Sequence, residues 1–271
     1  MSKVTAAEDP HKLADLAASQ ILAKSGLDRF DIAITLGSGW GQAADYLGET
    51  VASLPSSDIP GFSVSGIPGH SGTLRAVTMQ NGLNALLIGA RTHLYEGKGV
   101  RSVVHSVRSA AACGAETMVL TNGAGGIKGT FSPGQPVLIS DHINLTGETP
   151  LEGANFVDLT DLYSSKLREV ARAANSSLDE GVYVQFRGPN YETAAEVQMA
   201  KTMGGHIVGM STALEAIAAR EAKMEVLAFS LITNMAAGIS PNPLSHEEVI
   251  SIGKAAEPTL SKLLAETILA L

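Results

Sequence analysis

Apolar residues in this 271-residue chain recur either at helical spacing or in short continuous runs, and the two patterns alternate along its length. Leu13, Ala17 and Ile21 repeat with the period of an amphipathic helix. This spacing predicts a helix over residues 10–25 that ends before Gly26. Short apolar runs bounded by turn residues are typical of buried strands. The sequence predicts such strands over residues 31–36, 74–79, 83–89, 116–120, 137–140, 181–186, 207–210 and 226–232.

Local signals add turns and helix starts to this pattern. The dipeptide Asn81-Gly82 between two strands predicts a β-hairpin. Thr193 and Glu196 are spaced as a capping box, and Ser245 is expected to cap the last helix. The remaining helices are predicted over residues 100–113, 160–174, 194–203, from 211 onward and from 245 to about 271, with loops over residues 52–72, 121–127 and 141–156.

Strands and helices alternate through the whole length, without an internal repeat or a low-complexity linker. This alternation favours one α/β domain. We therefore expect a single-domain, three-layer fold over residues 1–271, with a central mixed β-sheet flanked by helices. Residues 1–9 are expected to be disordered.

Composition narrows the class of protein. Hydrophobic residues make up 45% of the chain and charged residues 17%, as in globular proteins. The net charge of −8 argues against nucleic-acid binding, which needs clustered Lys and Arg. No apolar run approaches the ~20 residues that span a bilayer, and the polar N-terminus lacks a signal-peptide pattern, so we expect a cytoplasmic protein without membrane contact. The single cysteine, Cys113, excludes an intrachain disulfide and is expected to be a small buried helix residue.

The densest group of polar side chains follows the strand predicted over residues 83–89. Arg91, His93, Tyr95 and Glu96 occur within six residues of each other, where that strand ends. Ligands of open α/β sheets lie outside the carboxyl ends of the strands. A cationic pair beside an aromatic ring suits a ligand that is anionic at one end and flat or sugar-like at the other. The alternative is an exposed strand end whose charges are simply solvated.

Other strand ends carry polar groups as well: Ser38, Asn122, Asn190-Tyr191-Glu192 and Ser211. Each alone has a structural explanation, because serines cap helices and asparagines satisfy turns. Their shared position at one edge of the predicted sheet favours a binding site. An arginine, serine hydroxyls and backbone N–H groups at helix starts suit phosphate, whereas a glutamate and asparagines suit the edge of a planar base. The histidines are scattered, so no metal site is predicted, and a G-x-S-x-G elbow is missing.

Eight short motifs also occur in an order and at spacings typical of one family. They are Leu36–Gly39, Pro68–His70, Arg91–Gly97, Thr121–Gly126, Gly188–Thr193, Gly209–Thr212, Thr233-Asn234 and His246–Val249. Together they resemble the trimeric, 6-oxopurine-specific class of purine nucleoside phosphorylases. The resemblance extends from about residue 10 to the C-terminus.

This resemblance implies phosphorolysis of a purine ribo- or deoxyribonucleoside, such as inosine or guanosine, to the free base and (deoxy)ribose 1-phosphate. It implies no cofactor, because inorganic phosphate is a co-substrate, and it implies a homotrimer. The roles that it assigns are phosphate binding for Ser38, His70, Arg91, His93, Gly123 and Ser211, ribose binding for Tyr95, Tyr191, Met210 and His246, base binding for Tyr191, Glu192 and Asn234, catalysis for His93, Glu192 and Asn234, and a contribution to a neighbouring subunit's site for Phe156.

These roles are chemically consistent. Breaking the glycosidic bond builds positive charge on the ribose and negative charge on the purine. Asn234 would bind the N7 and O6 region of the base, and ionised Glu192 would accept from N1–H of a 6-oxopurine, which predicts a preference for inosine and guanosine over adenosine. Glu96 is expected to brace the loop that carries Arg91 and His93.

Several alternatives stay open at this point. A xanthosine-preferring phosphorylase and a non-catalytic purine-nucleoside binding protein would share most of these residues. A methylthioadenosine phosphorylase is disfavoured, because those enzymes carry two serines where this chain has Glu192-Thr193. A nucleoside hydrolase is disfavoured as well, because the aspartate cluster of those enzymes is not found in this sequence. Met235 and Arg187 depart from the family pattern, and Arg187 is expected to point outward.

Overall fold

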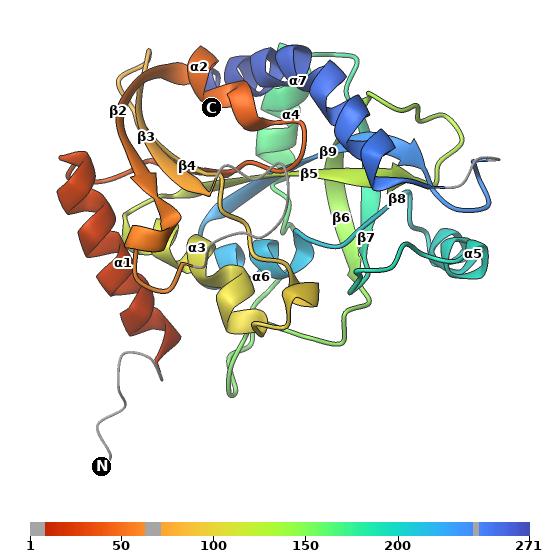
Figure 1. Cartoon of the computed structure of the whole chain (residues 1–271), viewed down its shortest axis with the longest axis horizontal. Helices are drawn as coiled ribbons and strands as arrows, with labels where there is room; N and C mark the ends of the chain where they lie inside the picture. The colour runs from red at the N-terminus through yellow and green to blue at the C-terminus, as the bar shows by residue number, and fades with distance from the viewer. Residues whose placement is uncertain (1–8, 63–71, 241–243) are drawn as a thin grey trace.

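A mixed sheet runs through the centre of the molecule, with helices on both of its faces (Figure 1). The computed structural model describes residues 9–62, 72–240 and 244–271. The nine strands are ordered β2-β3-β4-β1-β5-β8-β7-β6-β9. Their bounds are β1 Ile32–Thr35, β2 Gly48–Pro55, β3 Thr73–Met79, β4 Asn84–Ile88, β5 Thr117–Gly126, β6 Pro136–Asn144, β7 Asp179–Gln185, β8 Ile207–Gly209 and β9 Glu225–Met235.

The sheet closes on itself around β5. This strand pairs in parallel with β1 near its start, in parallel with β9 along its whole length, and antiparallel with β8 at Gly125 and Gly126. Strand β9 also pairs with β6, so β5, β8, β7, β6 and β9 form a ring. The carboxyl end of β5 is therefore surrounded by other strand ends, which brings residues from distant parts of the chain together.

Two helical layers cover the sheet. Helices α1, α3 and α6 lie on one face and α2, α4 and α7 on the other (Figure 1). Successive strand side chains point to opposite faces, so buried Leu86 of β4 joins the first layer and buried Leu87 joins the second. This arrangement confirms the three-layer prediction. The helices are α1 Pro10–Ser25, α2 Ala44–Leu47, α3 Val100–Ala112, α4 Ser165–Ala174, α5 Ala194–Thr202, α6 Ala213–Glu221 and α7 His246–Leu269, with short 3₁₀ turns at Gly41–Ala43, Ser56–Asp58 and Leu94–Glu96.

Predictions that rest on local signals are confirmed. The Asn81-Gly82 hairpin joins β3 to β4, the Thr193 and Glu196 capping box starts α5, and the Ser245 hydroxyl accepts from the backbone at the start of α7. Residues 1–8 of the segment expected to be disordered, residues 1–9, lie outside the described residues. Asp9 is described, and its side chain caps α1. None of the described helices is long and apolar enough to cross a membrane.

Four boundary predictions are wrong. The loop predicted from residue 52 begins inside β2, and the loops predicted from residues 121 and 141 begin inside β5 and β6. Most positions of β2 alternate between half-buried and exposed, so this edge strand has no apolar run to reveal it. The helix predicted over residues 160–174 begins only at Ser165.

Candidate active site

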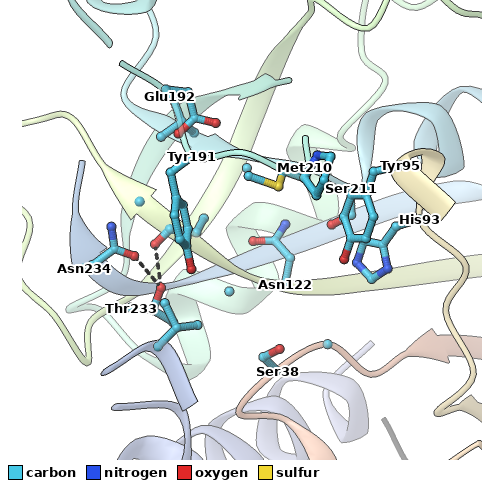
Figure 2. Close-up of a pocket in the computed structure, with 18 of the residues that line it drawn as sticks. Ser38, His93, Tyr95, Asn122, Tyr191, Glu192, Met210, Ser211, Thr233 and Asn234 are labelled. Carbon is cyan, nitrogen blue, oxygen red and sulfur yellow. Dashed lines mark hydrogen bonds between the residues drawn. The ribbon is translucent and has the colours of Figure 1, made fainter. Parts of the chain in front are cut away.

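A cavity of about 320 Å³ lies against the carboxyl ends of several strands, and Figure 2 shows the side chains that line it. Glu192, Tyr191 and Asn234 lie on one side of it, and His93 and Tyr95 lie on the other. The residues that the sequence predicted and that the structure places here are Ser38, Arg91, His93, Tyr95, Gly123, Tyr191, Glu192, Met210, Ser211 and Asn234.

Glycine brings the turn after β1 close to β5. A Cβ atom on Gly37 would lie 2.5 Å from the carbonyl oxygen of Thr121, which leaves no room for a side chain. The Gly37 N–H donates to Thr121 Oγ1 at 2.9 Å. A Cβ on Gly123 would lie 3.6 Å from Cβ of Ser38, so the Ser38 hydroxyl and the β5 backbone border the same part of the cavity. Hydroxyl and backbone donors in this arrangement suit an anion.

Arg91 is the buried cation of the site, with 2% of its surface exposed. Its Nε donates to Glu215 Oε1 at 3.1 Å, and its Nη1 donates to the carbonyl oxygen of Thr121 at 2.6 Å. Its Nη2 has no hydrogen-bond partner among the described residues. Buried polar groups are nearly always paired, so the free guanidinium nitrogen indicates a place for a ligand.

The loop after β4 holds an aromatic pair. The rings of His93 and Tyr95 are stacked, with centroids 4.8 Å apart and planes 17° apart. The backbone N–H of His93 donates to Glu96 Oε1 at 2.7 Å, and Lys98 donates to the other carboxylate oxygen at 2.7 Å. Glu96 therefore braces this loop, as the sequence predicted. Burial raises the pKa of Tyr95 to about 12, Glu96 adds to the rise and Arg91 opposes it, so the phenol is neutral at physiological pH.

The turn between β8 and α6 is strained. Thr212 has a φ of 84°, a value that β-branched residues rarely adopt. Asn122 Nδ2 donates to the Thr212 hydroxyl at 2.8 Å, and the backbone N–H of Ser211 donates to the Tyr183 hydroxyl at 3.2 Å. These contacts hold Ser211 at the cavity wall. Asn122 also lines the cavity. The sequence marked it as a polar strand end without assigning it a role.

Glu192 forms the opposite, acidic part of the site. The residue is 7% exposed, and its Oε1 has no hydrogen-bond partner among the described residues. Burial raises the pKa of its carboxyl above the ordinary glutamate value; its own backbone N–H opposes this rise and Glu196 adds to it. An unpaired, buried carboxylate oxygen indicates a ligand that carries an N–H group.

Asn234 lies beside Glu192 at this end, with its orientation set by its neighbours. Its Oδ1 accepts from the Thr233 hydroxyl at 2.9 Å, and its Nδ2 donates to the carbonyl oxygen of Met235 at 3.3 Å. Tyr191, 37% exposed, covers this part of the cavity (Figure 2). The carboxylate and the amide together can read the donor and acceptor edge of a planar base.

For two predicted site residues the side chain is not described, and a third does not line the cavity. His70 lies outside the described residues. His246 is the first residue of α7, and its side chain is outside the described part of the chain. Phe156 is 94% exposed and does not line the cavity of its own chain. Arg187 is exposed and does not line the cavity, and its Nη1 lies 3.9 Å from Glu148 Oε1, so its side chain points outward, as expected.

The cavity also has walls that the sequence did not single out. Val208 of β8 and Val249 of α7 supply apolar surface. Val249 ends the His246–Val249 motif, but the sequence assigned a role to neither valine. No group of three or more His, Cys, Asp or Glu in the described residues could hold a metal ion. Taken together, the cavity has a cationic end at Arg91, an apolar middle and an acidic end at Glu192.

This fold and this arrangement of side chains are those of an α/β enzyme whose cavity suits a small anion next to a flat polar ligand. The chain belongs to the phosphorylase superfamily, whose family model matches residues 31–269. It is 56% identical over 264 residues to the purine nucleoside phosphorylase of Cellulomonas sp, covering 96% of this chain and 94% of that protein. It is 50% identical over 260 residues to the purine nucleoside phosphorylase of Mycobacterium tuberculosis, covering 96% and 97%.

A solved structure extends the likeness to three dimensions. The crystal structure of a Schistosoma purine nucleoside phosphorylase in complex with hypoxanthine superimposes with a TM-score of 0.84 at 28% identity, covering 94% of this chain and 95% of that one. A further relative, purine nucleoside phosphorylase 1 of Bacillus subtilis, is 40% identical over 243 residues, with 86% of this chain and 89% of that protein covered. The family expected from the sequence is confirmed.

Proposed function

We propose that this protein is a purine nucleoside phosphorylase that transfers the ribose or deoxyribose of inosine or guanosine to inorganic phosphate. The observation that carries the proposal is the pairing of two unsatisfied buried groups across one cavity. Within the part of the chain that the structure describes, Arg91 Nη2 is a donor without a partner and Glu192 Oε1 is an acceptor without a partner. Phosphate satisfies the first and the N1–H of a 6-oxopurine satisfies the second. The named relatives support the same activity.

The phosphate end would bind the nucleophile through Arg91, His93, Ser38, Ser211 and the backbone at Gly123, which all line the cavity. Arginine and hydroxyl donors match the oxygens of phosphate in geometry and charge. His70 is proposed as an additional ligand from the family resemblance alone.

The ribose would lie between the two ends. Tyr95, Met210 and Tyr191 line the middle of the cavity, and His246 is proposed for the 5′-hydroxyl because α7 contributes Val249 to the wall nearby. As the glycosidic bond breaks, positive charge develops on the sugar next to the bound phosphate, which stabilises the charge and then attacks the anomeric carbon. The phosphate replaces the base on that carbon, and the base leaves with the bonding electrons.

The departing purine would be stabilised by Asn234 and Glu192. The Asn234 side chain is directed at the N7 and O6 region, where negative charge grows. An ionised Glu192 accepts from N1–H of hypoxanthine or guanine, whereas adenine presents a lone pair there. We therefore propose selectivity for 6-oxopurines. We also propose a role in purine salvage and a cytoplasmic location, and cell fractionation tests the location.

A homotrimer is part of the proposal. Phe156 is 94% exposed on a segment that is tied to α3, where Arg101 and Glu152 pair at 2.6 Å and Arg108 donates to the Pro150 carbonyl oxygen at 2.8 Å. A large aromatic ring held in full exposure suits contact with a second copy of the chain. Light scattering should give three times the chain mass. Phe156→Ala should lower turnover in the trimer, because the ring would complete a neighbouring site.

The decisive experiment incubates the protein with inosine, guanosine, xanthosine, adenosine or methylthioadenosine, each with and without phosphate. We expect base release from inosine and guanosine only when phosphate is present, together with ribose 1-phosphate. Release without phosphate would indicate a hydrolase, and no release with phosphate would refute the proposal. A preference for xanthosine would place the protein in the xanthosine-active group.

A further inference from the structure

Glu215 lies behind the phosphate end and is 1% exposed. It is the third residue of α6 and does not line the cavity. Both of its carboxylate oxygens lie 3.1 Å from Arg91 Nε, and Oε2 also accepts from the Thr212 backbone N–H at 3.0 Å. One buried carboxylate thus contacts the end of β4 and the turn after β8 at once.

These contacts fix the Arg91 guanidinium in one plane and one orientation. Nε is held by Glu215 and Nη1 by the carbonyl oxygen of Thr121. Neither of these two residues lines the cavity, so Nη2 is the nitrogen that remains to face it. Because the guanidinium group is planar and rigid, fixing Nε and Nη1 also fixes the position of Nη2.

The same carboxylate also stabilises the strained turn. Thr212 adopts a φ of 84°, and its N–H would be a buried orphan without Glu215 Oε2. The Thr212 hydroxyl lies 3.1 Å from the hydroxyl of Ser211, which lines the cavity. Displacement of Glu215 would therefore disturb Arg91 and Ser211 together.

We propose that Glu215 is a positioning residue for the phosphate co-substrate, holding the Arg91 guanidinium and the Ser211 turn in their binding geometry before phosphate arrives. This inference rests on the proposed function. The opposite charges of Arg91 and Glu215 balance each other in the buried ion pair, and Arg91 would offer phosphate one prearranged nitrogen, Nη2, beside the other donors of the site.

The competing explanation is that Glu215 only caps α6, and the chain offers a matched control for it. Glu196 is the third residue of α5 in the same type of capping box, where its Oε2 accepts from the Thr193 N–H at 2.8 Å. Among the described residues its carboxylate pairs with no arginine. Glu196→Gln thus removes a capping carboxylate without touching a guanidinium.

The test compares Glu215→Gln, Glu215→Asp and Glu196→Gln in steady-state phosphorolysis of inosine. Glutamine has one acceptor oxygen for two donors, so either Arg91 or Thr212 would face an NH₂ group. We expect Glu215→Gln to raise KM for phosphate about ten-fold or more while KM for inosine at saturating phosphate changes less than about three-fold. Glu215→Asp, which keeps both oxygens, should recover part of the loss. Glu196→Gln should leave KM for phosphate within about two-fold.

A second readout is thermal stabilisation by inorganic phosphate, which wild type should show and Glu215→Gln should largely lose. Equal increases in both KM values, or a loss of stability alone as in Glu196→Gln, would overturn the inference. If Glu215→Gln does not fold, the KM ratio of Glu215→Asp decides, and if neither folds the positioning role is withdrawn. Phosphate-independent base release by wild type would instead refute the proposed function.

Discussion

Replacing Glu192 with glutamine changes one charge at the base end of the cavity and almost nothing in shape. The wild-type carboxyl is 7% exposed and has one oxygen without a partner among the described residues. Glutamine also leaves a buried oxygen unpaired but carries no charge, and an unpaired buried charge costs more than an unpaired neutral group; a difference of about 1 kcal/mol corresponds to about 2 °C in Tm for a chain of this size. We therefore expect Glu192→Gln to be more stable than wild type at neutral pH.

The Tm difference between Glu192→Gln and wild type should depend on pH, and its direction can be measured. Burial raises the pKa of Glu192 in the folded protein, so the folded state binds the proton more tightly than the unfolded state does. The stability that this group contributes is present below the ordinary glutamate pKa and is lost as pH rises through the raised pKa. Glutamine does not titrate, so the Tm difference between variant and wild type should be small near pH 4 and should widen toward neutrality.

The same substitution should damage catalysis. A neutral amide oxygen is a weaker acceptor for the purine N1–H than a carboxylate, and loss of one well-aimed electrostatic contact typically lowers kcat/KM about 10²–10³-fold. The glutamine NH₂ can donate to the N1 lone pair of adenine, so the ratio of adenosine to inosine activity should rise. The assay is base release with both nucleosides, next to Tm measurements from pH 4 to 8.

A charge-matched control is Glu116→Gln, whose side chain is 79% exposed at the opposite end of the sheet from the cavity. It should change neither Tm nor activity by much. The assignment of Glu192 to the base would be refuted if Glu192→Gln kept wild-type activity on inosine. Equal or lower Tm at neutral pH would refute the stability argument.

Three further predictions concern the framework. Gly37→Ala places a methyl group 2.5 Å from a backbone oxygen of β5 and should destabilise the protein by about 1–3 kcal/mol in urea denaturation, whereas Gly129→Ala, which meets nothing within 4 Å, should not. Burial raises the pKa of Cys113 to about 12, so iodoacetamide at pH 8 should label it only after unfolding, and rapid labelling of the native protein would contradict its burial. Glu221→Gln leaves the buried Arg108 without its ion-pair partner and should cost about 3 kcal/mol of unfolding free energy; a loss below about 1 kcal/mol would mean that water solvates this pair.

The sequence predicts best what short-range signals control. The hairpin at Asn81-Gly82 and the capping box of Thr193 and Glu196 need only their own neighbours, and both form as expected. The glycine-rich run at the end of β5 was predicted as a loop because glycine usually ends strands. In the structure its glycines permit close packing instead, since a Cβ on Gly125 would lie 3.1 Å from Val208 of β8. Closure of the strand ring depends on contacts between distant segments, which no local pattern records.

The candidate site was predictable where chemistry coincides with strand ends. Arg91 and Ser211 follow predicted strands, and one edge of the sheet brings them together. The geometry that makes them useful was not predictable. The positive φ of Thr212 and the contact between Glu215 and Arg91 exist only when α6 packs against β5 and β9. A glutamate in the first turn of a helix looks like an ordinary capping residue in the sequence.

The buried charge is paired at one end of the cavity and unpaired at the other. At the phosphate end, Arg91 is neutralised by Glu215 and keeps one donor for a ligand, so the site exists before the anion binds. At the base end, the Glu192 carboxylate has no cationic partner among the described residues, and ionisation there is costly until an N–H donor arrives. Under the proposed function, phosphate binding would be favoured by prearrangement, whereas selection of the base would depend on relief of an unfavourable buried charge. A base without an N1–H would not supply that relief, so the proposal assigns the selectivity of the reaction to Glu192 and the binding of phosphate to Arg91.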